Sequence, residues 1–446
     1  MSPPSSTTSD TSYTPLDHSG QSKTTTVNVG MIGLGTVGTG VYKLLTKNPL
    51  VSVKTVAVKQ LNKTRQLTVP DSVLLTDDAT GIADDPDIHL VIELMGGVDQ
   101  AFHLVKTALQ NGKHVVTANK ELIAKHGPEL FEIANQARVR LLFEGAVAGG
   151  IPVIMPLQQS LVGNTIIEMA GILNGTTNYI LTQMSTSGCS FETALKEAQS
   201  LGFAEADPTN DVEGFDVAYK ISILSLIAFK KVVDPNKILR EGITAITATD
   251  IEIAREMGYC IKLLGFGRQH PDSKLDIRVH PMLLPLDHPL ASVHNEFNAI
   301  FVKGDAVGDV MLYGRGAGEM PTASAVCGDI LAIATGLQNH TDPVVTMKIN
   351  PVPAEGELLK PEATQNKYYL RMNTQDRPGV IGELGLAFGN AGVSIDSVMQ
   401  KGINADGTAA IIMITQAVSD AQITEGLRTI ERQNTACAVA CKLRVL

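Results

Sequence analysis

A carboxylate and a lysine stand four positions apart within a helical apolar pattern, at Asp216 and Lys220. The pattern runs over 215–229, and residues four apart on a helix lie on the same face. Because a lysine is almost never buried without a partner, Asp216 is the expected partner of Lys220. A lysine beside a carboxylate at the start of an apolar helix is a candidate proton donor. The residues alone leave an alternative open, namely a surface ion pair with the lysine stem along the helix edge.

A glycine-rich segment near the N-terminus has the spacing that binds the phosphates of a dinucleotide. It follows the β-branched run 27–32 and consists of Gly33, Leu34, Gly35, Thr36, Val37 and Gly38. In a GxGxxG pattern the first glycine permits a tight turn, the second lets the backbone approach a pyrophosphate, and the third lets the next helix pack on the strand. The N–H groups at the start of that helix then bind the phosphates. The position between a strand and a helix favours dinucleotide binding over a purely structural turn.

The residues after the second strand, expected at 52–58, bear on the choice of coenzyme. NAD-specific folds usually have Asp or Glu there, which binds the ribose hydroxyls. This chain instead has Lys59 and Gln60, with Lys63 and Arg65 close behind. A lysine can pair with the 2′-phosphate of NADP, so Lys59 favours NADP, with NAD also possible. The alternative is that these charges are solvated loop residues.

Two further strands are expected to end beside the cofactor. The first lies within 89–97 and ends at Met95 and two glycines, and the second ends at Thr117 and is followed by Ala118 and Lys120. Sites in parallel sheets lie at the carboxyl ends of the strands, so these residues should border the nicotinamide. A cation at the start of a helix is electrostatically unfavourable. This mismatch favours a functional Lys120 over a residue that only caps the helix.

The chain of 446 residues is long enough for several domains. Its fold class is α/β, with a Rossmann domain, an α+β domain and a small C-terminal domain in β-α-β-β-α-β order, the ferredoxin-like plan. The expected ranges are a disordered tail at 1–25, the nucleotide-binding domain at 26–155 with a return segment at about 315–340, the α+β domain at 156–314, a linker at 341–366 and the C-terminal domain at 367–446.

Composition excludes several classes of function. There are 36 basic and 46 acidic residues, so the net charge of −10 gives no basic footprint for nucleic acid. No uninterrupted apolar run is long enough for a membrane span, and the N-terminus lacks the apolar region of a secretory signal. Five cysteines without a CxxC pattern argue for reduced thiols and against a zinc site. We expect a cytoplasmic protein with small-molecule ligands and no nucleic-acid or membrane partner.

The motifs of the first three quarters of the chain closely resemble those of homoserine dehydrogenase. The matching segments are GLGTVG (33–38), TANKELIAKHG (117–127), EGAVAGGIPVI (144–154), AGILNGTTNYILTQM (170–184), GFAEADPTNDVEGFDVAYK (202–220) and GRGAGEMPTASAV (314–326). The C-terminal domain is similar to an ACT domain through DRPG (376–379) and NAGVSIDSV (390–398). The resemblance implies NAD(P)-dependent interconversion of L-aspartate 4-semialdehyde and L-homoserine, in threonine, methionine and isoleucine biosynthesis. It further implies that 156–314 is a catalytic and dimerisation domain in a homodimer or homotetramer.

The resemblance also implies roles for individual residues. Lys220 matches the position that gives a proton to the nascent alkoxide, and Lys120 matches a second lysine where cofactor and substrate meet. Glu205 and Asp216 match the acids that hold the substrate ammonium, through charge-assisted hydrogen bonds. Asp211 matches a further acid of the motif, with the alternative that it caps the helix carrying Asp216.

Three more ligand sites are implied by the same resemblance. Gly202 and Gly318 correspond to backbone that contacts the cofactor. A sodium ion would lie in the glycine-rich turn, with ligands from Glu144 and the carbonyl groups of Val147, Gly149 and Ile151. Threonine would act as an effector at the ACT domain, where Thr415 and Gln416 stand at positions at which relatives often have histidine.

Two competing hypotheses make different demands on the sequence. A catalytically inactive amino-acid sensor would keep the fold, but it would not need the whole set of Lys120, Glu205, Asp216 and Lys220. A dehydrogenase acting on a hydroxy acid would need a His–Asp or Arg–Glu–His set. The histidines near the expected cofactor edge are instead predicted on sheet or helix surfaces, at His89, His103 and His114.

Overall fold

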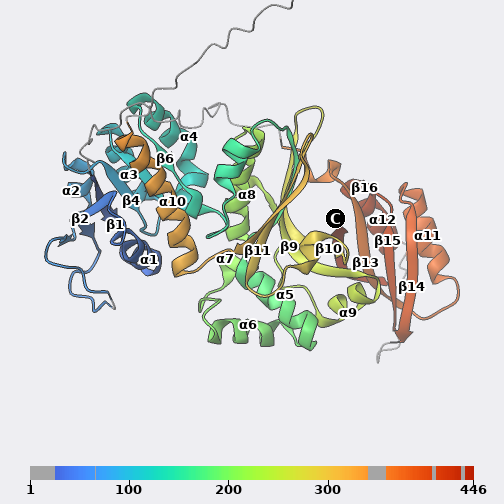
Figure 1. The fold of residues 1–446 in the computed structure, drawn as a ribbon. Helices are drawn as coiled ribbons and strands as arrows, with labels where there is room; N and C mark the ends of the chain where they lie inside the picture. Colours follow the sequence, from blue (N-terminus) through green and yellow to red (C-terminus); the bar gives the residue numbers. More distant parts are fainter. Residues whose placement is uncertain (1–25, 66, 340–357, 404–407, 433–436) are drawn as a thin grey trace, which may run out of the picture.

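The computed structural model describes residues 26–65, 67–339, 358–403, 408–432 and 437–446. The described chain forms three domains in a row, and the second lies between the other two (Figure 1). The tail expected at 1–25 and the linker residues 341–357 lie outside the described residues.

The first domain is a parallel sheet of six strands in the order β3-β2-β1-β4-β5-β6, which is the Rossmann order. The strands are β1 (Val27–Ile32), β2 (Val51–Ala57), β3 (Leu74–Thr76), β4 (Leu90–Glu93), β5 (His114–Thr117) and β6 (Leu141–Leu142). Apolar, largely β-branched runs form β1, β2 and β4, as expected of parallel strands that are covered on both faces. The covering helices are α1 (Thr36–Leu45), α2 (Ala79–Asp84), α3 (Asp99–Gln110) and α4 (Lys120–Ala137).

Helix α10 (Glu319–Gln338) follows the last strand of the second domain and lies among the helices of the first domain (Figure 1). It packs on α1, and its buried residues Ala323, Val326 and Ile330 join the same apolar cluster as Val29 and Met31 of β1. By length and composition this is the one helix, among the described residues, that is apolar enough to cross a membrane. Its apolar side chains are instead used to complete the core of the Rossmann domain.

The second domain is an antiparallel sheet with helices packed against it. Its strands are β7 (Ile166–Ile172), β9 (Tyr259–Gln269), β10 (Leu275–Pro285), β11 (Phe297–Gly304) and β12 (Gly308–Arg315), in the order β12-β11-β7-β9-β10. Its helices are α5 (Gly175–Ser187), α6 (Phe191–Ser200), α7 (Thr209–Val212), α8 (Phe215–Phe229) and α9 (Ala248–Glu256). Helix α8 packs on β9 and β10 and also on α4 of the first domain, so it stands at the boundary between the two.

The third domain has the predicted β-α-β-β-α-β order, with one additional two-residue strand. Its elements are β13 (Gln365–Gln375), α11 (Val380–Asn390), β14 (Ile395–Ile403), β15 (Thr408–Thr415), β16 (Val418–Ser419), α12 (Asp420–Arg432) and β17 (Cys437–Val445). The strand order β17-β13-β15-β14 is that of a ferredoxin-like sheet with both helices on one face.

The second and third domains share one continuous sheet, which the sequence did not predict. Strand β17 pairs in parallel with β10, with Met282 opposite Arg444 and Leu283 opposite Val445. The end of the expected linker is also ordered, because the Leu359 N–H donates to Leu275 O at 2.7 Å and β13 already begins at Gln365. The C-terminal domain is therefore not a separate unit but an extension of the second sheet.

Candidate active site

The glycine-rich loop has the geometry that its pattern predicts. Gly33 has φ +106°, and a Cβ there would lie 2.6 Å from Leu94 O. A Cβ on Gly38 would lie 2.4 Å from Gly33 O, whereas Gly35 has open space around it. Helix α1 begins at Thr36 without a side-chain cap, so its first N–H groups are available to an anion. These features fit the phosphates of a dinucleotide.

The carboxyl ends of β4 and β5 are tied together by a buried acid that sequence reasoning missed. Glu93 accepts hydrogen bonds from the Met95 N–H at 2.8 Å and from the Thr117 hydroxyl at 2.5 Å. Burial raises the pKa of Glu93 to about 7, although these hydrogen bonds oppose the rise. The Asn119 side chain caps α4 through the Leu122 N–H and also donates to Gly97 O at 2.7 Å. The loops carrying Met95 and Ala118 are thus fixed beside the glycine-rich loop.

The start of α10 lies against the helix of the glycine-rich loop. Gly318 has φ +117° and precedes the first residue of α10. A Cβ on Gly40 of α1 would lie 2.8 Å from Glu319 O, and Lys43 pairs with Glu319 at 2.7 Å. Gly318 therefore lies where the sequence predicted a return to the cofactor region.

Lys59 lies just beyond β2 and is exposed. Its neighbour Arg65 is turned onto its own loop, where the guanidinium donates to the carbonyl groups of Gln60, Leu61 and Lys63. Arg65 therefore stabilises the loop, and Lys59 is the cation nearest to the end of β2.

A cavity of about 590 Å³ lies between the first and second domains. Its polar walls are formed by Lys120, Glu121, Asn174, Glu205, Asp207, Asn210, Asp211, Asp216, Tyr219, Lys220, Glu296 and Arg315. Backbone from Gly202 and from 316–318 also lines it, so the cavity extends from the predicted substrate acids to the start of α10. Glu296 and Arg315 form an ion pair at 2.8 Å and were not expected in the site.

Lys220 and Asp216 form the predicted ion pair on α8. The Lys220 ammonium lies 2.7 Å from Asp216 Oδ2 and donates to Leu173 O at the same distance. Its side chain is only 11% exposed, which excludes the alternative of a surface ion pair. Burial lowers the pKa of Lys220, and the attraction of Asp216 reduces this effect without cancelling it. A buried amine with a lowered pKa on a cavity wall can exchange a proton with a bound ligand.

Lys120 binds the other oxygen of the same carboxylate, a contact that spans 96 positions of sequence. The Lys120 side chain is 38% exposed and reaches Asp216 from the first turn of α4. Burial alone would lower the pKa of Lys120, but the attraction of Asp216 outweighs it and leaves this pKa raised. Burial would raise the pKa of Asp216, and the two ammonium groups lower it instead. One carboxylate thus binds two lysines whose pKa values shift in opposite directions.

Asn174 joins the two acids of the site and was missed by sequence reasoning. Its amide nitrogen donates to Asp211 Oδ1 at 2.7 Å and to Asp216 Oδ2 at 2.9 Å. Its amide oxygen accepts the Thr177 N–H at 2.9 Å and caps α5. The alternative that Asp211 caps α8 is wrong, because Gly214 is the N-cap and no side chain caps this helix.

The two acids predicted to bind a substrate ammonium lie in different settings. Asp216 already accepts from Lys120, Lys220 and Asn174, so both of its oxygens are engaged within the protein. Glu205 lines the cavity and is exposed. Its backbone carbonyl accepts from Gln199 at 3.0 Å, which orders the loop that carries it. Glu205 is therefore the better placed of the two to meet a cation from solution.

The carboxylate of Glu144 is engaged by backbone rather than directed into the glycine-rich turn. It accepts the N–H groups of Val153 at 2.6 Å, Ile154 at 2.8 Å and Met155 at 2.8 Å. Unpaired N–H groups at the start of a helical turn are strong partners for an anion, which explains the preference. A sodium ligand from Glu144 would have to be its backbone carbonyl. The described residues contain no group of three or more His, Cys, Asp and Glu that could hold a metal.

His114 was expected at the surface, and the structure corrects this. It is buried in β5, where its Nδ1 accepts the Arg140 N–H at 3.0 Å, and burial lowers its pKa to about 4. His89 is exposed, and its Nδ1 accepts the Asn28 N–H at 3.1 Å. Neither imidazole lines the cavity, so neither is available to act on a ligand there.

Comparison with known proteins places both halves of this site in one family. One family profile, described as the NAD-binding domain of homoserine dehydrogenase, matches residues 33–144, and a second, described as homoserine dehydrogenase, matches 152–331. The homoserine dehydrogenase of Synechocystis sp. is 44% identical over 434 residues, which is 94% of this chain and 100% of that protein. That of Bacillus subtilis is 40% identical over 429 residues, covering 94% and 98%.

Solved structures agree with these relatives. A crystal structure of a homoserine dehydrogenase from Thiobacillus denitrificans has a TM-score of 0.87 at 39% identity and covers 95% of this chain and 98% of its own. A hyperthermophilic archaeal homoserine dehydrogenase in complex with NADPH has a TM-score of 0.60 at 26% identity, covering 70% and 98%. The first profile contains the glycine-rich loop and Lys120, and the second contains Asp216 and Lys220. The chain therefore belongs to the homoserine dehydrogenase family of NAD(P)-dependent oxidoreductases.

Proposed function

We propose that the chain interconverts L-aspartate 4-semialdehyde and L-homoserine with Lys220 as the proton donor. The observation that carries this proposal is the Lys220 ammonium, buried on the cavity wall and bound to Asp216 at 2.7 Å. A nicotinamide coenzyme supplies the hydride that goes to the carbonyl carbon of the aldehyde. Lys220 gives its proton to the carbonyl oxygen and takes it back in the oxidative direction.

The other polar residues of the cavity orient the substrate in this scheme. Lys120 lies at the end of β5, where the coenzyme and substrate meet, and its raised pKa keeps it cationic beside the developing alkoxide. Glu205 binds the amino group of the substrate. Asp216 positions both lysines and does not bind the substrate ammonium directly. Asp211 acts indirectly, through its hydrogen bond with Asn174.

The coenzyme in this proposal is NADP, with NAD as the second possibility. The exposed Lys59 after β2 supports a 2′-phosphate, as does the NADPH complex of the archaeal relative. A sodium ion, if bound, would be held by carbonyl oxygens of the turn at 144–151, because the Glu144 carboxylate is engaged elsewhere.

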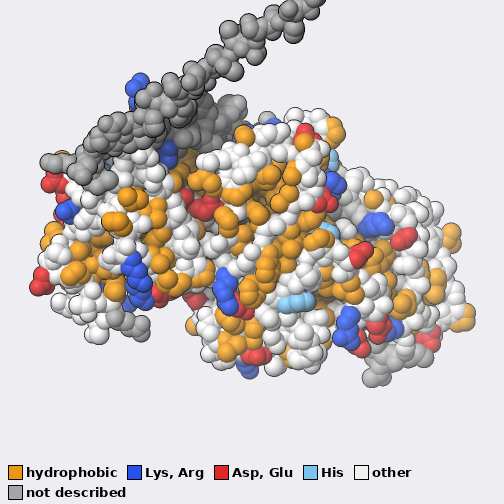
Figure 2. Space-filling model, viewed as in Figure 1, with side chains coloured by type: hydrophobic (Ala, Val, Ile, Leu, Met, Phe, Trp, Pro, Cys, Tyr) orange, Lys and Arg blue, Asp and Glu red, His pale blue; other side chains and the backbone are white. Residues whose placement is uncertain are grey.

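The assembly in this proposal is a homodimer or homotetramer, with threonine as the effector at the C-terminal ACT domain. The second sheet supports pairing with another copy, since apolar side chains gather over the middle of the molecule in Figure 2. Ile167 of β7 and Met311 and Tyr313 of β12 are exposed by 38%, 36% and 53%. Exposed apolar patches commonly mark interfaces.

An absorbance assay of the purified chain tests the proposal. We expect reduced coenzyme to form from L-homoserine, faster with NADP⁺ than with NAD⁺, and threonine to slow the reaction. The competing sensor hypothesis predicts no reaction with either coenzyme although amino-acid binding persists. Gel filtration of the same sample reports the oligomeric state.

A further inference from the structure

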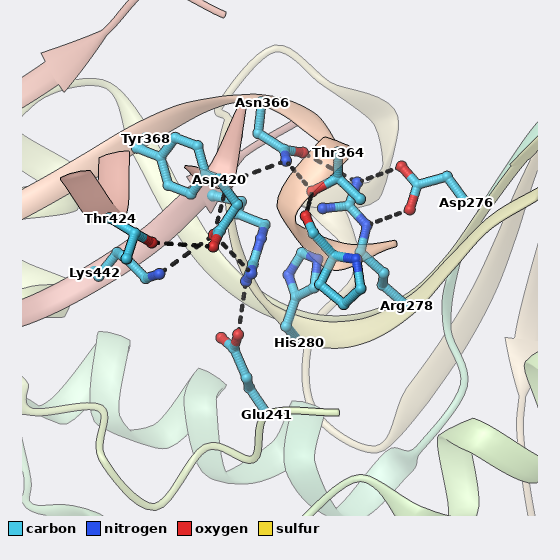
Figure 3. Close-up of polar contacts among 12 residues, drawn as sticks. Glu241, Asp276, Arg278, His280, Thr364, Asn366, Tyr368, Asp420, Thr424 and Lys442 are labelled. Carbon is cyan, nitrogen blue, oxygen red and sulfur yellow. Dashed lines mark hydrogen bonds and ion pairs between the residues drawn. The ribbon is translucent and has the colours of Figure 1, made fainter. Parts of the chain in front are cut away.

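A buried polar cluster lies at the seam between the second sheet and the C-terminal domain (Figure 3). At its centre is Arg444 of β17, whose side chain is 4% exposed. Its guanidinium donates to Glu241 Oε1 at 2.9 Å and lies 3.5 Å from Asp420 Oδ1. Asp420 is also bound by the Tyr368 hydroxyl at 3.0 Å and by Lys442 at 3.3 Å. Within the described parts of the chain, Glu241 is the ion-pair partner that the second domain supplies to Arg444.

Glu241 follows β8 (Leu239–Arg240), which pairs with β10 on the same edge as β17. The Glu241 N–H donates to Val279 O at 2.8 Å, so β10 and β17 hold this residue from two sides. The segment 239–244 is thus anchored to the C-terminal strand through a charge-assisted hydrogen bond, which is about twice as strong as a neutral one.

The same segment 239–244 contacts both ends of the turn between α7 and α8. The Ile243 N–H donates to Val212 O at 2.9 Å, and a Cβ on Gly242 would lie 2.5 Å from that oxygen. The Arg240 guanidinium lies 3.5 Å from the centre of the Phe215 ring, at the first residue of α8. The turn is therefore held at both of its ends by residues next to Glu241.

This turn sets the spacing of the acids in the cavity. Asp211 lies just before it, and Asp216 and Lys220 follow on α8. Gly214 at its tip has φ +78°, and a Cβ there would lie 2.9 Å from Val279, so the turn has little freedom on the side of β10. A shift of this turn changes the distance between Asp211 and Asp216, which Asn174 bridges.

We propose that Glu241 and Arg444 are positioning residues for the reaction, because their ion pair holds segment 239–244 against the α7–α8 turn and so keeps Asp211 at its distance from Asp216, the two acids that Asn174 joins. The last strand of the chain then contributes to the geometry of a site that it does not touch. The inference rests on the proposed role of Lys220 as proton donor.

A second ion pair across the same seam provides a matched control. Arg371 of β13 donates to Asp250 of α9 at 2.7 Å, and their side chains are 11% and 0% exposed. Asp250 forms the capping box of α9 with Thr247, and this helix packs on β9 and α5. Breaking this pair leaves a fully buried carboxylate without its cation. Substitution of Arg444 also removes the cation from Glu241 and Asp420. Glu241 is 37% exposed and so can be solvated, and Asp420 still pairs with Lys442.

The decisive experiment compares Arg444→Met with Arg371→Met in the full chain. We expect Arg371→Met to lower Tm more, because it strands a buried charge, and to leave kcat within about twofold. Arg444→Met should lower Tm less but reduce kcat by about tenfold, within the range of remote coupling. If Arg371→Met does not fold, Lys401→Met breaks the more exposed pair with Glu256 of α9 and serves instead.

The pH profile of homoserine oxidation distinguishes positioning from general damage. Oxidation needs neutral Lys220, and the charge of Asp211 favours the cationic form of Lys220, so a displaced Asp211 moves the acidic limb to lower pH in Arg444→Met. Glu241→Gln should give a smaller shift in the same direction. Loss of kcat in proportion to loss of Tm across all variants, or an unshifted limb, would overturn the inference. Full activity of Lys220→Met would instead overturn the proposed function and is measured in parallel.

Discussion

The second domain has two boundaries, and they use charged side chains in opposite ways. Toward the Rossmann domain, Lys120, Asp216 and Lys220 meet on the wall of a cavity of about 590 Å³. Toward the C-terminal domain, the sheet continues from β10 into β17, and the guanidinium side chains of Arg371 and Arg444 are only 11% and 4% exposed. At the boundary with the Rossmann domain, charged side chains line a cavity. At the boundary with the C-terminal domain, they pair with one another within the protein.

This difference has a consequence for mutation. A charge beside a cavity contributes mainly to the transition state, whereas a charge buried between strands contributes mainly to folding once its partner is fixed. Substitutions at the two boundaries should therefore separate activity from stability. Arg444 is the expected exception, since its partner Glu241 adjoins the α7–α8 turn.

The largest effect is expected from Lys220→Met. Loss of the general acid should reduce kcat by at least about 10³-fold, while coenzyme binding, measured by fluorescence titration of NADPH, stays within about twofold. Lys230→Met, at the other end of α8, removes a lysine outside the cavity and serves as the control. Equal losses of turnover and coenzyme binding would indicate a folding defect. The effect at this boundary would then be one on stability, as at the other boundary.

Asp250→Asn tests the boundary at the C-terminal domain. It removes the anion that pairs with Arg371 and weakens the capping box with Thr247 at the start of α9. The free energy of unfolding, measured by urea titration, should fall by about 3–5 kcal/mol. Under native conditions kcat should change less than twofold. A large drop in kcat without a drop in stability would reverse the distinction drawn between the two boundaries.

Glu93 extends the comparison to pH, because it is a buried acid whose contacts, among the described residues, are hydrogen bonds and not ion pairs. Its pKa is raised to about 7 in the folded protein, so the folded state holds this proton more tightly than the unfolded chain. Its stabilising contribution is complete below the unfolded carboxyl pKa of about 4 and is lost as pH rises through about 7. Relative to Glu93→Gln, the stability of the unmodified chain should decline by about 3 kcal/mol over this window. Parallel pH curves for the two proteins would show that Glu93 is ionised throughout.

The smallest effect is expected at the edge of the nucleotide domain. Lys59→Ala removes one exposed cation, and exposed pairs contribute about 0.2–1 kcal/mol. The KM for NADPH should therefore rise by no more than about fivefold, while the KM for NADH stays unchanged. Lys63→Ala in the same loop is the matched control. An unchanged ratio of the two KM values would remove Lys59 from the 2′-phosphate site.

Local patterns were enough to predict much of this molecule. The spacing of Gly33, Gly35 and Gly38 predicted the dinucleotide loop, because Gly33 and Gly38 have no room for a Cβ whereas Gly35 has open space around it. The four-residue interval between Asp216 and Lys220 determined their ion pair, because the helix itself brings them together. The order of strands and helices in 367–446 likewise predicted the C-terminal domain.

Contacts between distant segments were beyond the reach of such patterns. Nothing local indicates that Lys120 shares Asp216 with Lys220, since 96 residues separate the two partners. The Glu144 carboxylate was expected to face a cation. Its oxygens instead accept hydrogen bonds from backbone N–H groups nine to eleven residues later in the sequence. Asn174 was visible as part of a polar turn, yet its bridging of two acids depends on how α5 meets α8.

The sequence by itself determined which residues are candidates for the chemistry and that one helix presents both Asp216 and Lys220. Only the tertiary structure decided that one carboxylate serves two lysines, and that β17 closes the edge of β10 beside Glu241. The physical reason is that helix and turn geometry depends on neighbours a few residues apart. Burial and ion pairing depend instead on which surfaces meet after the domains have packed.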